Sequence, residues 1–247
     1  MKIYKAAIIG LGASGLAVNK IIYGESSDKV IAFENKDINN RDNFFGFWLT
    51  EWMKPFERII EKKWNKWSIE TPYSKVNHLS NAKPYCVISF KKWKKYCLET
   101  KNKLDIVNKQ VIEYLPINNY FKIITADKEE YYAEKIYDSR STREKKGELI
   151  QHFLGINITV ADNTFNDEKL TLMHFTQENN LLHFIYILPF SHNKALVEST
   201  VFSKEAFDDS WYIEKIKNYL MLNNITKFEE QSMEKGIIPM FFAEQKK

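Results

Sequence analysis

One carboxylate, Glu198, stands inside an otherwise apolar, strand-forming stretch of the chain. It belongs to the segment 195–200, which closely follows the apolar run 184–191. Alternation along a strand places Glu198 on one face together with Leu196 and Thr200. If that face is open to solvent, Glu198 is an ordinary exposed acid. If the face lines an apolar cavity, desolvation raises the pKa of the carboxyl group, which then stays protonated near neutral pH and donates a proton.

His174 is a second candidate for proton chemistry. It lies in the apolar, strand-forming segment 172–175. Because an imidazole titrates close to neutral pH, His174 is a candidate proton partner of Glu198. The alternative is a hydrogen-bonded histidine of the core, and the sequence leaves both interpretations open.

A glycine pattern typical of dinucleotide-binding proteins lies near the start of the chain, directly after the apolar residues 6–9. In such a pattern the first glycine makes a tight turn, the second lets the backbone approach a pyrophosphate, and the third lets helix and strand pack closely. Glu34 comes nineteen residues after the last glycine, Gly15, the distance at which an acid meets ribose hydroxyls. The site is predicted from Gly10, Gly12, Ser14, Gly15 and Glu34. It does not distinguish FAD from NAD.

Hydrophobic periodicity indicates the elements that must position these residues. Residues 5–9 and 29–33 are expected to be strands with a helix over 16–23 between them, which is a βαβ opening. A basic amphipathic helix is expected from Phe90 onward. Three further strands are expected over 107–115, 120–125 and 133–137.

The residue pattern changes after Arg140, where short strand-forming segments follow one another with polar connections. They are expected over residues 152–160, 170–176, 182–188 and 195–202. Such closely spaced strands favour an antiparallel sheet. A helix capped by Asp208 or Asp209 should then extend to about Leu222.

Composition narrows the function classes. A chain of 247 residues that is 44% hydrophobic buries a sizeable core, and 36 basic residues nearly balance 32 acidic ones. The net charge of +4 therefore does not indicate a strongly basic, nucleic-acid-binding protein. Cys86 and Cys97 lack metal-ligand spacing, which favours reduced thiols and no metal site. No apolar stretch reaches the roughly 20 residues that cross a bilayer, so we expect only peripheral membrane contact.

Several segments, in the same order, resemble the bacterial and plant lycopene cyclase family of flavoproteins. They are GLGASG at 10–15, GFW at 46–48, YDSR at 137–140, QHFLG at 151–155, LTLMHF at 170–175, FIYILPFS at 184–191, ALVEST at 195–200 and EKGIIPM at 234–240. The combination of QHFLG, the LPFS strand and LVEST is far more specific than the glycine pattern, and the resemblance covers nearly the whole chain.

The resemblance implies an α/β fold in which a Rossmann-like FAD/NAD(P)-binding lobe carries an inserted antiparallel-sheet substrate lobe. We expect residues 1–66 and 86–148 in the first lobe and 67–85 and 149–247 in the second. It also implies FAD in its reduced form, NAD(P)H as the reductant, and a role for Asp138 and Arg140 at the cofactor. Glu198 matches the catalytic acid of the family.

The implied reaction is the acid-initiated cyclisation of lycopene end groups to β-ionone rings, which is an isomerisation without net redox change. Lycopene or a related linear carotene is the expected substrate, and the protein is expected in the cytoplasm at the membrane surface. Aromatic faces from Tyr186, Phe184 or Phe202 would stabilise the carbocation. The alternatives are an FAD-dependent oxidoreductase, such as a monooxygenase or polyene reductase, and an inactive carotenoid-binding fragment.

Three departures from the family pattern stand out. Ser199 occupies the position where the family usually carries a second acid, and His174 replaces the aspartate of the family's LMDF segment. Members usually continue past the IPM segment into a glycine-rich stretch that contacts the flavin and then into helices, so we expect this chain to be a C-terminally shortened relative.

Overall fold

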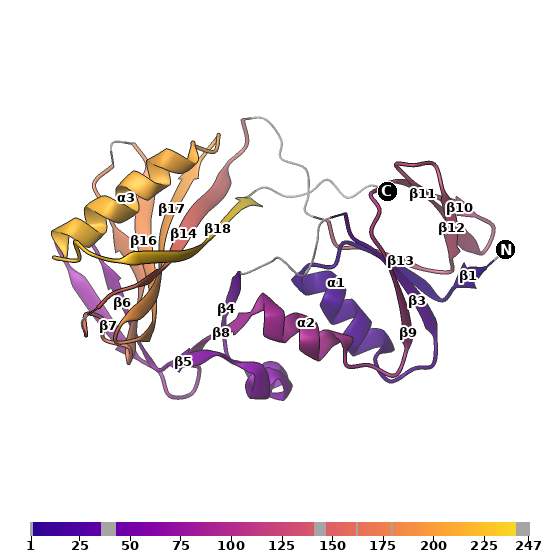
Figure 1. Cartoon of the computed structure of the whole chain (residues 1–247), viewed down its shortest axis with the longest axis horizontal. Coiled ribbons are helices and arrows are strands. Elements are labelled where there is room, and N and C mark those ends of the chain that lie inside the picture. The colour runs from indigo at the N-terminus through magenta and orange to yellow at the C-terminus, as the bar shows by residue number, and fades with distance from the viewer. Residues whose placement is uncertain (1, 36–42, 141–146, 162, 179, 241–247) are drawn as a thin grey trace. The chain divides into compact units, whose positions relative to one another are not determined.

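The computed structural model describes residues 2–35, 43–140, 147–161, 163–178 and 180–240 (Figure 1). The chain divides into two compact units, Met1–Phe45 with Ile88–Ser141, and Gly46–Val87 with Thr142–Lys247. Of the three crossings between the units, one comes between Ser141 and Thr142, and the other two fall within strands of a small sheet with the order β4-β8-β5. Its strands are β4 (Phe44–Trp48), β8 (Tyr85–Ser89) and β5 (Lys62–Trp64).

The first unit is built on a parallel sheet with the strand order β13-β2-β3-β9. These strands are β2 (Ala6–Ile9), β3 (Lys29–Phe33), β9 (Lys103–Val107) and β13 (Ile136–Asp138). All four residues of β2 are buried, which explains its continuous apolar sequence, because a parallel sheet is covered on both faces.

One face of this sheet is covered by helices and the other by a second sheet. The helices are α1 (Ala13–Val18), the π-helical turn η1 (Asn19–Tyr23) that continues it, and α2 (Phe90–Leu98), and they lie side by side in Figure 1. The second sheet has the order β1-β12-β11-β10. Its strands are β1 (Ile3–Tyr4), β10 (Val111–Ile117), β11 (Tyr120–Thr125) and β12 (Glu130–Ala133).

The βαβ opening and the amphipathic helix at Phe90 are confirmed, whereas two of the expected strands are wrong in extent. The strand expected over 107–115 is broken, because residues 108–110 separate β9 from β10. The strand expected over 133–137 is two strands in different sheets. Glu134 and Lys135 carry the chain from one sheet to the other, with each bonded to a different partner strand.

The second unit contains a seven-stranded sheet with the order β18-β14-β17-β16-β15-β6-β7. The strands are β6 (Lys66–Glu70), β7 (Lys75–Leu79), β14 (Ile150–Thr159), β15 (Lys169–Phe175), β16 (Leu182–Ser191), β17 (Lys194–Ser203) and β18 (Glu229–Pro239). Neighbouring strands are antiparallel except β15 and β6, which are parallel. The expected antiparallel sheet is thus part of a larger, mixed one, whose strands β6, β7 and β18 the sequence did not reveal. The 3-10 helix η2 (Glu51–Ile59) belongs to the same unit.

The helix α3 (Asp209–Leu222) packs along one face of this sheet (Figure 1). Its buried residues Tyr212, Ile216 and Leu220 form one core with inward residues of the strands, among them Leu154 and Val197. Because side chains alternate along a strand, the residues between these point to the opposite face. The sheet therefore has one apolar face, which packs under α3, and a second face that points away from α3.

The division into units differs from the expected lobes mainly at residues 46–66. We expected this stretch in the first lobe, and it belongs to the second unit. The reason is its backbone pairing. The N–H of Leu49 donates to the carbonyl oxygen of Pro84, and the strand β5 pairs with β8.

Candidate nucleotide and acid sites

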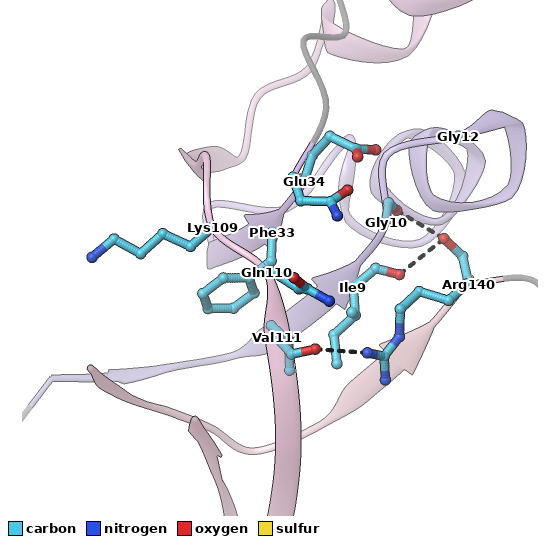
Figure 2. A pocket seen from close by; sticks show the side chains of 11 residues that line it. Ile9, Gly10, Gly12, Phe33, Glu34, Lys109, Gln110, Val111 and Arg140 are labelled. Atoms are coloured by element: carbon cyan, nitrogen blue, oxygen red, sulfur yellow. Dashed lines mark hydrogen bonds between the residues drawn. The ribbon is translucent and has the colours of Figure 1, made fainter. Parts of the chain in front are cut away.

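A cavity of about 480 Å³ lies at the carboxyl end of β2 and β3 in the first unit (Figure 2). It is lined by Ile9, Gly10, Gly12, Phe33, Glu34, Asn35, Lys109, Gln110, Val111, Ser139 and Arg140. Ligands of parallel α/β sheets bind at this edge, outside the carboxyl ends of the strands. The cavity thus lies where the glycine pattern predicts a nucleotide.

Two glycines shape the turn between β2 and α1. Gly10 has a φ of +90°, a conformation that side chains disfavour. A Cβ on Gly15 would lie 1.9 Å from the carbonyl oxygen of Gly10, which is far inside contact distance. The close packing of helix against turn therefore requires glycine at position 15.

Glu34 follows β3 and is 7% exposed. Its Oε2 accepts a hydrogen bond of 3.0 Å from the backbone N–H of Leu11, inside the glycine turn. The same carboxylate lines the cavity. Since a carboxylate accepts several hydrogen bonds, Glu34 can hold the turn and also receive hydroxyl groups of a ribose.

The segment after β13 closes the cavity on another side. The Ser139 hydroxyl group lies within hydrogen-bonding distance of the carbonyl oxygens of Ile9 and Gly10, at 3.1 and 2.8 Å. Arg140 donates to both carboxylate oxygens of Asp138 and, at 2.8 Å, to the carbonyl oxygen of Val111. Burial raises the pKa of the Asp138 carboxyl group, but the bonds from Arg140 outweigh it and lower that pKa.

The predicted cofactor residues thus have different positions. Gly10, Gly12, Glu34 and Arg140 line the cavity. Gly15 supports the turn from behind. Ser14 is exposed on the first turn of α1 and is not part of the lining, and Asp138 reaches the cavity only through Arg140.

Sequence reasoning missed the lining residues Lys109, Gln110 and Ser139. The first two lay in a segment expected to be strand. The Lys109 side chain extends away from the other lining residues in Figure 2, because its ammonium pairs with Asp127 and Glu129. Ser139 stood between the two residues that we did select, and no pattern marked it.

Glu198 lies in β17 of the second unit, on the face opposite α3. The neighbouring residues Val197 and Ser199 are fully buried and Val197 belongs to the core with α3. Glu198 is half-buried, and its Oε1 accepts a hydrogen bond from the Thr200 hydroxyl group. Burial, with a smaller contribution from the negative charge of Glu234, raises the pKa of its carboxyl group to about 8, although the Thr200 hydrogen bond lowers it. A carboxyl group with this pKa is protonated at neutral pH and can act as an acid.

A chain of aromatic side chains begins directly opposite this acid. Tyr186 stands directly opposite Glu198 on β16, and its hydroxyl group donates to that of Tyr85 at 2.9 Å. The Tyr85 ring lies edge-on to Trp48 at 4.9 Å between centroids, and Trp48 lies 5.6 Å from Trp67. Burial raises the pKa values of both tyrosines, which therefore stay neutral.

Gly46 explains why the GFW segment carries a glycine. A Cβ at this position would lie 2.2 Å from the Tyr85 hydroxyl oxygen and 3.2 Å from that of Tyr186. The glycine thus makes room for the tyrosine pair. Neither Tyr85 nor Gly46 was chosen from the sequence, because they are remote from Glu198 in the chain.

The other aromatic candidates are placed differently. Phe184 is 6% exposed and packs edge-on to Phe175, with 5.7 Å between centroids. Phe202 shares the strand face of Glu198 by alternation and is half-buried. Of the three aromatics named from the sequence, Tyr186 is the one directly opposite the acid.

His174 lies on the opposite face of the sheet from Glu198. It pairs with Ile185, a core residue under α3, whereas Glu198 pairs with Tyr186. Its Nδ1 is 3.2 Å from Glu70 Oε2 and its ring is 5.0 Å from that of Tyr219 of α3. The structure does not bring His174 to Glu198, and we do not carry the proton-partner hypothesis further.

Comparison with solved structures shows the fold. A geranylgeranyl bacteriochlorophyll reductase-like protein from Thermoplasma acidophilum matches with a TM-score of 0.70 at 10% identity, covering 97% of this chain and 67% of that one. The halogenase PltM in complex with phloroglucinol and FAD matches with a TM-score of 0.64 at 10% identity, covering 96% and 60%. The p-nitrophenol 4-monooxygenase PnpA from Pseudomonas putida gives 0.70 at 7% identity, covering 96% and 68%.

The chain therefore has the mixed α/β fold shared by these enzymes, and it spans 60–68% of their lengths. The sequence profile of the family described as lycopene cyclase protein matches residues 6–247, and the chain belongs to that family. None of the curated proteins matches the sequence. In the part of the chain that the structure describes, no helix is both long enough and apolar enough to cross a membrane.

Proposed function

We propose that the protein is an FAD-dependent lycopene β-cyclase that converts end groups of a linear carotene to β-ionone rings. The observation that carries the proposal is Glu198, a carboxyl group whose surroundings keep it protonated at neutral pH beside aromatic rings. Family membership supports the substrate class. Since carotenes dissolve in lipid, the proposal includes peripheral contact with a membrane and no role for nucleic acid.

The residues of the first unit fit an adenine dinucleotide. Gly10 and Gly12 leave backbone accessible to a pyrophosphate, Glu34 would accept ribose hydroxyls, and Arg140 would add positive charge at the cavity. FAD kept reduced by NAD(P)H would supply negative charge that favours a cationic intermediate.

The acid step follows from the residues of the second unit. The Glu198 carboxyl group gives its proton to a terminal double bond, which leaves a tertiary carbocation in the carotene. The neighbouring double bond attacks this cation and closes a six-membered ring, and loss of a ring proton restores a double bond. One proton enters and one leaves, so the product is an isomer of the substrate.

The rings around Glu198 would protect the cation. Tyr186 stands opposite Glu198, and Tyr85 and Trp48 extend the aromatic surface from Tyr186. Aromatic faces stabilise cations by roughly 0.5–2 kcal/mol, with the larger value where water is excluded. The tyrosine hydroxyl groups bind each other, which reduces their availability as nucleophiles toward the cation.

Expression in lycopene-accumulating bacterial cells, followed by chromatography of the pigments, tests the proposal. We expect γ-carotene or β-carotene from the wild-type chain and unchanged lycopene from Glu198→Gln, because glutamine cannot donate the proton. Ser199→Ala is the matched control, since Ser199 lies on the other face. Unchanged lycopene with soluble, flavin-loaded wild-type protein would contradict the proposal.

A second candidate is an FAD-dependent oxidoreductase, which the fold shared with a monooxygenase and a reductase-like protein favours. Such an enzyme consumes NADPH in proportion to product, whereas a cyclase needs reductant only to keep the flavin reduced. Measuring NADPH consumed per carotene converted separates the two. Purified protein that retains a carotene but no flavin would instead support an inactive carotenoid-binding fragment.

A further inference from the structure

Gly155 lies between two glutamates in the sheet of the second unit. In the pairing of β14 with β17 it stands directly opposite Glu198, and in the pairing of β14 with β18 directly opposite Glu234. Residues that stand opposite each other in a sheet project to the same face. Glu198 and Glu234 therefore flank one position that has no side chain.

The space above Gly155 is bounded by the two glutamate side chains. A Cβ built on Gly155 would lie 3.4 Å from the Cβ of Glu198 and 3.4 Å from the Cγ of Glu234. It would also lie 2.9 Å from Leu196 Cδ1. A larger residue would fill the space between the two carboxyl groups, so glycine lets them approach one another.

The position that carries a second acid in the family does not face this space. Ser199 points under α3, where its hydroxyl group is 2.8 Å from Nε2 of the buried His183. A side chain at position 199 is thus separated from Glu198 by the sheet itself. Glu234, remote in sequence, is on the side of the acid.

We propose that Glu234 is the second carboxyl group of the acid site and that it titrates as a coupled pair with Glu198 across Gly155, which favours the protonated form of Glu198 between turnovers. Two carboxyl groups on either side of one residue position do not ionise independently, because the first negative charge opposes the second. Glu234 acts here as a positioning residue for the proton. The inference deepens the proposed function, on which its catalytic meaning rests.

Among the described residues, other titratable groups that face Glu198 come from β16 and β8. Tyr186 comes from β16 and Tyr85 from β8, and burial keeps both neutral. Next to Glu234 on β18, Lys235 points to the opposite face and pairs with Asp209 of α3 at 2.8 Å. Within the described residues, β14 places Phe153, Gly155 and Asn157 on this face, none of which titrates.

Carbon-13 NMR of protein labelled at the glutamate carboxyl carbons tests this coupling without flavin or substrate. The Glu198 signal is assigned by its loss in Glu198→Gln. We expect Glu234→Gln to lower the protonation midpoint of Glu198 by about one pH unit or more, as for strongly coupled groups. Glu229→Gln, which removes an exposed carboxylate from the same strand, should leave the midpoint in place.

The wild-type titration provides the second measurement, in case Glu234→Gln does not fold. Coupled carboxyl groups each titrate in two steps that belong to the pair, and we expect this for both signals. Single-step curves in the wild type, or equal midpoints in Glu234→Gln and Glu229→Gln, would overturn the inference. Because these readouts do not depend on cyclisation, they separate its failure from a failure of the proposed function.

Discussion

Replacing Glu198 with Gln should change how the stability of the second unit depends on pH. Burial raises the pKa of the folded carboxyl group to about 8 from its ordinary value of 4.5. The folded state therefore binds this proton more tightly than the unfolded state. Tighter binding of this proton stabilises the folded state. This stabilisation is fully present below about pH 4.5 and is lost as the pH rises to about 8.

The size of the effect follows from the shift. A rise of about 3.5 pH units at about 1.36 kcal/mol each corresponds to about 5 kcal/mol between pH 4 and pH 9. This is an upper limit, because Glu198 is half-buried and water can approach the ionised form. We expect a change of about 2–5 kcal/mol in the free energy of unfolding of wild type relative to Glu198→Gln.

Urea unfolding followed by tryptophan fluorescence at pH 5, 7 and 9 measures this difference. The variant has no titrating group at position 198, so it corrects for every other ionisation in the chain. We expect the wild type to lose stability relative to the variant from pH 5 to pH 9. A constant difference at the three pH values would refute the assignment of Glu198 as an acid that folding keeps protonated.

Three further predictions follow from the geometry. Gly15→Ala should reduce bound flavin at least about tenfold, measured by absorbance of the purified protein, because its Cβ would lie 1.9 Å from a carbonyl oxygen; the exposed Ser14→Ala is the control. Gly46→Ala should displace the Tyr85 hydroxyl group and lower cyclisation in the pigment assay while protein yield is kept; full activity would contradict the role of the tyrosine pair. Ser199→Ala should lower the free energy of unfolding by about 1–3 kcal/mol, because the buried His183 loses a hydrogen bond, and leave the pigment pattern unchanged.

The local parts of the nucleotide site could be predicted from the sequence. The glycine turn and Glu34 depend on a spacing within a single βαβ unit, where strand, turn and helix positions are set by neighbouring residues. The position of Lys109 and Gln110 could not be predicted, since it depends on where one strand ends and another sheet begins. The break between β9 and β10 at residues 108–110 leaves no mark in the hydrophobic pattern of the sequence.

The acid site was predictable only in part. Alternation gave the residues that share a face with Glu198, but not which face is covered by α3. That depends on long-range packing of residues 209–222 and on the return of residues 46–85 to the second unit. For the same reason Tyr85 and Glu234 were missed, although both approach Glu198 in space.

The parallel pairing of β6 with β15 has a consequence for folding during synthesis. Lys66 stands opposite Lys169 in this pairing, so the hairpin of β6 and β7 leaves the ribosome well before its partner strand exists. At about 5–20 residues per second, the β6 edge of this hairpin waits on the order of ten seconds for its partner. An unpaired strand edge invites association with other chains, so the interval before β15 appears is when the nascent protein most needs a chaperone.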